Sequence, residues 1–279
     1  LYEDNDCVVI NKPKGLLSHS KGAFNPEATV ETWLRSKTKI TGERAGIVHR
    51  LDRATSGVMI CAKTPSALVH LQKQFSQRKT KKTYMAVVSG HLSPEHAIID
   101  MPIGRNSRKP KTFMVMNEGK NAVTEYKVLQ SVDKYDLVEL KPVTGRTHQL
   151  RAHMAAIGHP IVGDAKYGGP EAFLTGGISR KLHLHARRIR IDSPDGGAID
   201  VTAELPPHFA ESLATLGFEA MAGDSVRPRN LYHAVKEGAA FGLARRDVAA
   251  AFWPRFGSRR VGAWRTAGPR ARSDARSRS

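Results

Sequence analysis

Short apolar runs of strand length are the feature that most restricts how this chain can fold. Cys7-Val8-Val9-Ile10 is the first and stops at Lys12-Pro13-Lys14-Gly15, and Gly57–Ala62 is the second. The runs are not joined by the regular helices of a doubly wound sheet, so the pattern predicts an α+β fold with a large, mostly antiparallel sheet and flanking helices. Further runs of this kind cover residues 84–88, 123–128 and 137–140.

Three segments carry the spacing and the end signals of helices. Asn25 followed by Pro26 is typical of an N-cap and a first helical position, which predicts a helix from there to about Ser36. Thr64-Pro65 predicts the start of a second helix, with apolar residues on one face up to Phe75. Residues 147–156 form the third, which Gly158 and Pro160 end.

The charge of the chain indicates a polyanionic partner. The sequence has 44 Lys and Arg against 26 Asp and Glu, a formal net charge of +18, and such a field attracts nucleic acid or an anionic membrane. No apolar stretch approaches the length of a membrane span, and the first residues are acidic rather than those of a secretion signal. Cys7 and Cys61 are too few for a disulfide framework. We therefore expect a soluble, cytoplasmic protein without a membrane partner.

The positive charge is concentrated in the last part of the chain. From Val226 to Ser279 there are 13 basic residues, 12 of them arginine, and three acidic ones. We expect a domain over residues 1–222 and an Arg-rich extension over 223–279 that is partly disordered, with disorder from about Gly257 and an optional short helix over 235–252. Two interpretations of the extension stay open: a nonspecific RNA-binding arm, or an addition without a function.

One segment places a carboxylate among cations just before an apolar strand. In His49-Arg50-Leu51-Asp52-Arg53-Ala54-Thr55-Ser56-Gly57, Asp52 stands between two arginines at the entry to the 57–62 strand. A carboxylate held by guanidinium groups stays ionised and can act as a nucleophile or a base. Taken alone, the same pattern also suits a structural loop ion pair.

This segment resembles the signature of the RluA-type pseudouridine synthases, which isomerise uridine within RNA. The resemblance covers roughly residues 1–210 and continues through four further motifs in the order found in the family. It implies a mixed sheet with a central cleft floored by the catalytic loop. The further motifs are Lys82-Thr83-Tyr84-Met85-Ala86, the run from Gly145 to Arg151, the run from Gly158 to Asp164, and Leu182-His183-Leu184-His185-Ala186.

The resemblance also implies roles for particular residues. Asp52 is the catalytic carboxylate, Arg151 the basic residue that pairs with it, and Tyr84 the active-site tyrosine, whose ring stacks on a flipped uracil and whose hydroxyl is a candidate base for the C5 proton. Leu150 packs beside the target base, and Arg50 reaches into the RNA to fill the space of the extruded uridine. For Arg50 a structural salt bridge is the alternative. We expect His148 to orient Arg151 or a backbone group, without a catalytic role.

The reaction requires no cofactor, because the uracil is released, turned and rejoined through C5 with no net redox change. No dinucleotide or phosphate-loop fingerprint is present in the sequence. His183 and His185 alternate as metal ligands can in a strand, but without a third ligand nearby we expect core and hydrogen-bonding roles, and no metal. Whether Asp52 forms an ester at C1′ or removes the C2′ proton to give a glycal is left open.

Substrate contacts are expected beyond the cleft, at the basic runs 104–111 and 78–82. Arg105 and Arg108 in the first run are candidate phosphate ligands, with a solvated surface as the alternative. We expect a monomer that acts on large-subunit ribosomal RNA, with transfer RNA as the alternative target. Many relatives carry an S4-type domain ahead of the catalytic one, and this sequence starts at Leu1, so it either lacks that domain or is a fragment.

Two functions of other classes stay in view. A noncatalytic RNA-binding or ribosome-assembly protein would suit the charge, but not the joint presence of Asp52, Tyr84 and Arg151. An RNA hydrolase would need a second carboxylate beside Asp52. Asp164, in a glycine-bounded turn, is the one candidate, and we interpret it as structural.

Overall fold

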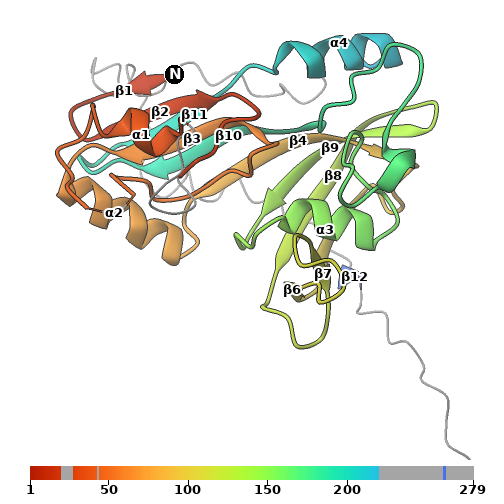
Figure 1. Ribbon diagram of the computed structural model, residues 1–279, viewed down its shortest axis with the longest axis horizontal. Helices are drawn as coiled ribbons and strands as arrows, with labels where there is room; N and C mark the ends of the chain where they lie inside the picture. The colour runs from red at the N-terminus through yellow and green to blue at the C-terminus, as the bar shows by residue number, and fades with distance from the viewer. Residues whose placement is uncertain (20–27, 43, 220–259, 262–279) are drawn as a thin grey trace, which may run out of the picture.

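The structure is a computed structural model, and it describes residues 1–19, 28–42, 44–219 and 260–261. Its centre is a ten-stranded, mostly antiparallel sheet, which confirms the expected α+β fold (Figure 1). The two parallel contacts within the sheet join β10 to β3 and β12 to β5. The strands follow one another across the sheet as β1 (Tyr2–Glu3), β2 (Cys7–Lys12), β3 (Ser56–Ala62), β10 (Leu184–Asp192), β4 (Lys81–Ser89), β9 (Tyr135–Pro142), β8 (Val123–Val132), β5 (His96–Asp100) and β12 (Arg260–Val261), with β11 (Ala198–Thr202) paired to β10.

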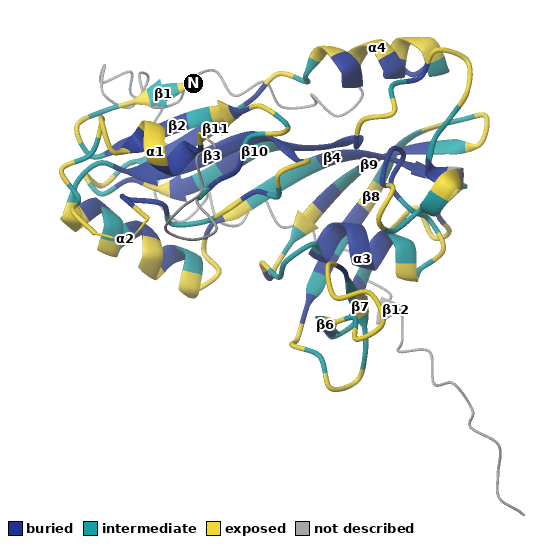
Figure 2. Ribbon diagram, viewed as in Figure 1, coloured by how far each residue is buried: buried dark blue, intermediate teal, exposed yellow. Residues whose placement is uncertain are grey.

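Helices cover both faces of this sheet. Strand β3 is buried along its whole length because its alternate side chains pack in opposite directions. Val58 and Ile60 pack with α2 (Pro65–Ser76), and Met59 and Cys61 pack with α1 (Val30–Leu34). The buried residues accordingly run along the central strands in Figure 2.

The other half of the sheet is covered in the same way. Leu150 and Met154 of α3 (Gln149–Ala156) pack on Ala86 and Leu140. On the opposite face, α4 (Pro207–Leu216) packs on the alternate residues of β4. Figure 1 shows α2 and α3 on one side of the sheet and α4 on the other. Among the described helices, none is long and apolar enough to cross a bilayer.

A small hairpin and a short helix complete the described chain. The hairpin joins β6 (Ile103–Arg105) to β7 (Phe113–Val115) outside the main sheet, and it contacts α3. A 3-10 helix, η1 (Gly169–Ala172), follows α3. Within the Arg-rich extension, the described residues Arg260 and Val261 form β12 and pair in parallel with Ile98 and Ile99 of β5. The helix expected over 235–252 lies outside the described residues.

Most predicted elements are confirmed, and three boundaries differ. The first helix begins at Val30, with Thr29 as its N-cap in a capping box with Thr32, whereas the predicted start at Asn25-Pro26 lies outside the described residues. Strands β8 and β9 extend to a tight turn at 133–134 rather than ending at Val128. The third helix begins at Gln149, because His148 has φ 55° and cannot continue a right-handed helix.

Candidate active site

A cleft of about 530 Å³ opens between the end of α2 and the start of α3, over strand β4. This volume lies within the usual range of sites for small molecules and cofactors. Its walls come from three segments far apart in the sequence, 48–55, 75–84 and 142–151, and from Leu184 on β10. Five of the residues expected at the site line it: Arg50, Asp52, Tyr84, Leu150 and Arg151.

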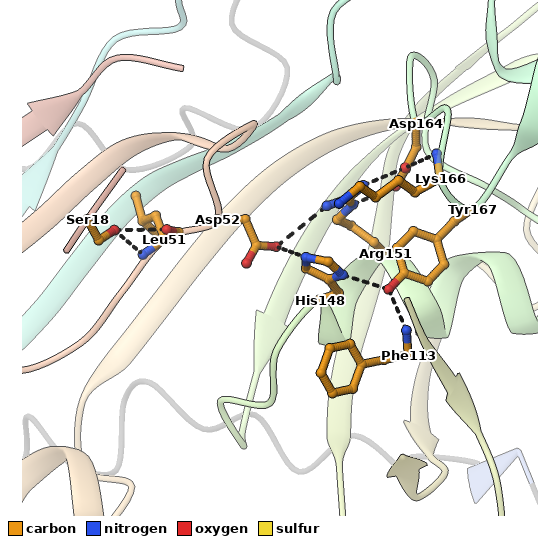
Figure 3. Close-up of polar contacts among 9 residues, drawn as sticks. All are labelled: Ser18, Leu51, Asp52, Phe113, His148, Arg151, Asp164, Lys166 and Tyr167. Carbon is orange, nitrogen blue, oxygen red and sulfur yellow. Dashed lines mark hydrogen bonds and ion pairs between the residues drawn. The ribbon is translucent and has the colours of Figure 1, made fainter. Parts of the chain in front are cut away.

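The backbone around Asp52 is fixed on both sides. Before it, the Leu51 N–H donates to the Ser18 hydroxyl at 3.1 Å, and that hydroxyl donates back to the Leu51 carbonyl at 2.8 Å (Figure 3). After it, the Thr55 N–H donates to the Asp52 carbonyl at 3.0 Å. These bonds fix the backbone on both sides of Asp52 and leave both oxygens of its carboxylate available for other contacts.

A buried lysine supports the neighbouring loop. Lys12 is fully buried, and its ammonium group donates to the carbonyls of Pro13 and Leu16 at 3.0 and 2.8 Å. Burial lowers the pKa of Lys12 to about 8, although Asp52 acts in the opposite direction. In the sequence this lysine marked only the end of a strand, because a buried ammonium group has no local signature.

Arg151 stands between two carboxylates and is much closer to one of them. Its Nε and Nη2 atoms each donate to Asp164 at 2.7 Å, and its Nη1 lies 3.8 Å from Oδ2 of Asp52. The guanidinium group of Arg151 lies over the aromatic ring of Tyr167, and its central carbon is 5.0 Å from the centre of that ring. Asp164 is therefore not a second catalytic acid. It anchors the cation that faces Asp52.

His148 also faces Asp52 rather than bonding to Arg151. Its Nε2 lies 3.8 Å from Oδ2 of Asp52, and its Nδ1 lies 2.7 Å from the Tyr167 hydroxyl, which accepts the Phe113 N–H at 3.0 Å (Figure 3). Burial lowers the pKa of His148, with Asp52 opposing that shift and Arg151 adding to it. The imidazole is thus a neutral group beside the carboxylate at neutral pH. Among the described residues, the polar contacts of the ring are with Asp52 and Tyr167, and not with Arg151 or a backbone group as expected.

Both contacts of the Asp52 carboxylate reach the same oxygen. Arg151 and His148 approach Oδ2, and among the residues that the structure describes no polar group is bonded to Oδ1. An ionised carboxylate with one unoccupied oxygen in a cleft can attack an electrophilic carbon or remove a proton.

Tyr84 forms part of the cleft next to this carboxylate. It lies on β4 and packs against the apolar clusters of both halves of the sheet. Burial raises the pKa of Tyr84 above its usual range, and the charge of Asp52 adds to the rise. The side chain is therefore a neutral phenol with an apolar ring face, which suits stacking on a planar base.

The basic residues expected to bind RNA divide into two groups. Arg50 is exposed at the cleft, and Lys82, whose pKa burial lowers to about 8, lines it as well. Arg105 and Arg108 lie on the β6–β7 hairpin and are not among the described residues that line the cleft. Arg105 lies over the Phe113 ring at 5.7 Å, so it borders the His148 side of the site.

His183 and His185 are buried among other groups. His185 Nδ1 lies 2.9 Å from the Ser56 hydroxyl at the start of β3, and His183 Nδ1 lies 3.3 Å from the Val162 carbonyl. Burial lowers the pKa of each to about 4. Within the described part of the chain, no cluster of three or more His, Cys, Asp or Glu side chains is arranged to hold a metal ion.

The geometry agrees with the comparison of this chain with known families. The family model for RNA pseudouridylate synthase matches residues 6–156. This chain belongs to that family.

This chain covers different shares of the length of its relatives in the family. The chain is 45% identical over 174 residues to an uncharacterized RNA pseudouridine synthase of Aquifex aeolicus, which is 60% of this chain and 55% of that protein. The chain thus spans about half the length of that relative. It is 41% identical over 211 residues to the dual-specificity RNA pseudouridine synthase RluA of Escherichia coli, with 75% of this chain and 93% of the relative covered.

A solved structure supports the family fold. Human RNA pseudouridylate synthase domain containing 4 superposes with a TM-score of 0.64 at 30% identity, and the match covers 79% of this chain and 93% of that one. The segment matched by the family model contains Asp52, Tyr84 and Arg151 and ends before Asp164 and Tyr167.

Sequence reasoning missed the parts of this synthase site that lie after the third helix. From the sequence, Asp164 was interpreted as a structural residue of a turn, without its bond to Arg151. No motif or spacing in the sequence indicated a role for Tyr167. One signal was available for His148, because it lies three positions before Arg151 and the two were expected on one face.

Proposed function

We propose that this chain is an RNA pseudouridine synthase that isomerises uridine to pseudouridine in large-subunit ribosomal RNA. The observation that carries the proposal is the Asp52 carboxylate, which has one oxygen facing Arg151 and His148 and its other oxygen unbonded by described residues, in a cleft wide enough for a nucleotide. Family membership supplies the reaction class.

The reaction needs the uridine outside its helical stack. An enzyme that acts on a base in folded RNA extrudes the nucleotide and holds it in a pocket. Here Asp52 reacts at the ribose, Tyr84 presents its ring to the uracil, and Leu150 supplies an apolar wall. Arg50 is exposed at the cleft and reaches into the gap in the RNA. After the glycosidic bond breaks, the uracil turns and its C5 bonds to the ribose C1′ in place of N1. The C5 proton is then lost and N1 gains a proton from solvent, with the neutral Tyr84 hydroxyl as a relay that passes its own proton on to water as it takes the one from C5.

The choice of RNA rests on relatives. The ribosomal large subunit pseudouridine synthase D of Borreliella burgdorferi is 40% identical over 222 residues, which is 77% of this chain and 67% of that protein. The dual-specificity relatives favour a second RNA target for this chain, and transfer RNA is the one to test.

The experiment is tritium release from C5-labelled uridine in ribosomal RNA and, separately, in transfer RNA. The chain is compared with Asp52→Asn, which removes the charge and keeps the shape, and with Asp100→Asn, an exposed aspartate on β5. We expect release by the chain and by Asp100→Asn, and none by Asp52→Asn, which still binds RNA. Release by Asp52→Asn, or none by the unaltered chain on any ribosomal or transfer RNA, would overturn the proposal. Release from transfer RNA alone would replace the ribosomal target.

A further inference from the structure

Three polar groups form a line that ends at the catalytic carboxylate. The Phe113 N–H on β7 is 3.0 Å from the Tyr167 hydroxyl, that hydroxyl is 2.7 Å from Nδ1 of His148, and Nε2 of His148 is 3.8 Å from Oδ2 of Asp52 (Figure 3). The groups come from the β6–β7 hairpin, the segment after α3, the residue before α3 and the loop before β3. Backbone segments far apart in the sequence thus meet at one imidazole ring.

The hydrogen atoms in this line have an arrangement that gives every group a partner. The Tyr167 oxygen accepts the Phe113 N–H, and the Tyr167 proton goes to Nδ1 of His148, which lies 2.7 Å away. Burial raises the pKa of Tyr167 to about 12, so the hydroxyl keeps that proton. A neutral imidazole that accepts at Nδ1 carries its proton on Nε2. The N–H of His148 then points at Asp52.

The opposite tautomer is unfavourable at both ends of the ring. With the proton on Nδ1, the lone pair of Nε2 would face the negative Oδ2 of Asp52, and the Tyr167 proton would lose the acceptor at 2.7 Å. His148 also has a left-handed backbone, φ 55°, which costs free energy in a residue other than glycine. Strained residues of this kind concentrate at functional sites, and His148 is one of the residues that line the cleft.

We propose that Tyr167 and the β6–β7 hairpin fix His148 as the Nε2–H tautomer, and that His148 is a positioning residue whose N–H, together with Arg151, holds Oδ2 of Asp52 so that Oδ1 meets the substrate. This inference rests on the proposed synthase function and adds residues to it. The hairpin that carries Arg105 and Arg108 is thereby linked to the catalytic carboxylate through one backbone N–H.

The first test reads the tautomer directly and needs no activity. Long-range nitrogen–proton NMR correlations of the histidine rings at neutral pH identify which nitrogen carries the proton, and His148→Asn assigns the signal. We expect Nε2–H in the unaltered chain and a larger share of Nδ1–H in Tyr167→Phe. That variant removes only the hydroxyl and keeps the ring over Arg151. An Nδ1–H tautomer in the unaltered chain would overturn the proposal, whether or not the protein is active.

The second test separates the two ends of the imidazole. His148→Gln places an amide N–H near the position of Nε2, where it can face Asp52. His148→Asn places an acceptor near the position of Nδ1, but its side chain is too short to put a donor near Asp52. In single-turnover assays with the RNA that releases tritium, we expect Tyr167→Phe and His148→Asn to be slower by about tenfold at saturating RNA. We expect His148→Gln to recover part of the rate. RNA affinity should be unchanged in all three.

The pH profile provides a readout that a purely structural role would not move. A hydrogen bond donated to Nδ1 favours the neutral ring, so its loss in Tyr167→Phe raises the His148 pKa, and the His148 ring signals followed by NMR against pH titrate at higher pH in that variant. The ionisable groups that face the ring are Asp52, Arg151, Asp164, Lys166 and Tyr167.

The results separate this inference from the proposed function. Unchanged rates in Tyr167→Phe and His148→Asn, or slower rates explained entirely by weaker RNA binding, would overturn the positioning role. Inactivity of the unaltered chain on every uridine-labelled RNA would overturn the proposed function, and with it the positioning role, while the NMR experiment still decides the tautomer.

Discussion

Arg151 is bonded to Asp164 through two hydrogen bonds of 2.7 Å, while the carboxylate it faces in the cleft, Asp52, lies 3.8 Å away. The guanidinium group is therefore fixed by one carboxylate and presented to another. Such an arrangement places positive charge near Asp52 without a short hydrogen bond to its carboxylate. A short charge-assisted hydrogen bond would stabilise the carboxylate and so reduce its reactivity.

Replacing Asp164 by Asn should weaken both the fold and the reaction. Arg151 and Asp164 have side-chain exposures of 6% and 0%, and a buried ion pair that loses one charge costs about 3 kcal/mol or more. Denaturant unfolding would measure that loss, and a single-turnover assay the fall in rate. Asp200→Asn is the matched control, because Asp200 forms a similar pair with Arg188 on β10 and β11, outside the cleft lining. It should lower stability and leave turnover unchanged.

Tyr84→Phe should bind RNA normally and isomerise uridine slowly. The ring that stacks on the base is kept, and the hydroxyl proposed to carry the C5 proton is lost. Because burial and Asp52 raise the Tyr84 pKa, its titration should produce no alkaline limb in the rate up to pH 10, its ordinary value. Tritium release against pH measures both effects. Full activity of the variant would exclude the hydroxyl from proton transfer.

Removing charge from the hairpin should change affinity without changing chemistry. Arg108, Lys109 and Lys111 are exposed between β6 and β7 and lie outside the lining of the cleft. Their replacement by Gln should weaken RNA binding and reduce the salt dependence of the association constant by about 0.7 to 0.9 per lost phosphate contact. Filter binding over a range of salt concentrations measures this slope. An unchanged slope would assign these residues to a solvated surface.

The protein should lose stability as the pH falls from about 6.5 to 4. His183 and His185 are fully buried, and burial lowers the pKa of each to about 4, from 6.5. In that pH window the unfolded state binds more protons than the folded state, so the free energy of unfolding decreases with falling pH, by up to about 1.4 kcal/mol per unit for each group. Urea unfolding at several pH values should show a shallower dependence in His185→Asn. Equal slopes would mean that His185 does not contribute.

The sequence predicted local features well because their causes are local. The apolar run at 57–62 became β3, and Thr64 caps α2 as the Thr-Pro pair indicated. The start of α3 was placed two residues early, because His148 has a left-handed backbone that the helical spacing of the sequence does not indicate.

The sequence by itself determined the α+β class, the basic character and the family, because strand periodicity, charge and motif order are properties of the chain. Motif order also selected Asp52, Tyr84 and Arg151 as the candidate site residues. The tertiary structure alone decided that Asp164 holds Arg151 and that His148 faces Asp52 with Tyr167 behind it. It also decided that Arg105 and Arg108 lie on a hairpin beside the cleft rather than in it. These relationships depend on which loops meet in space, and hydrogen-bond and charge contacts act over a few ångströms irrespective of sequence separation.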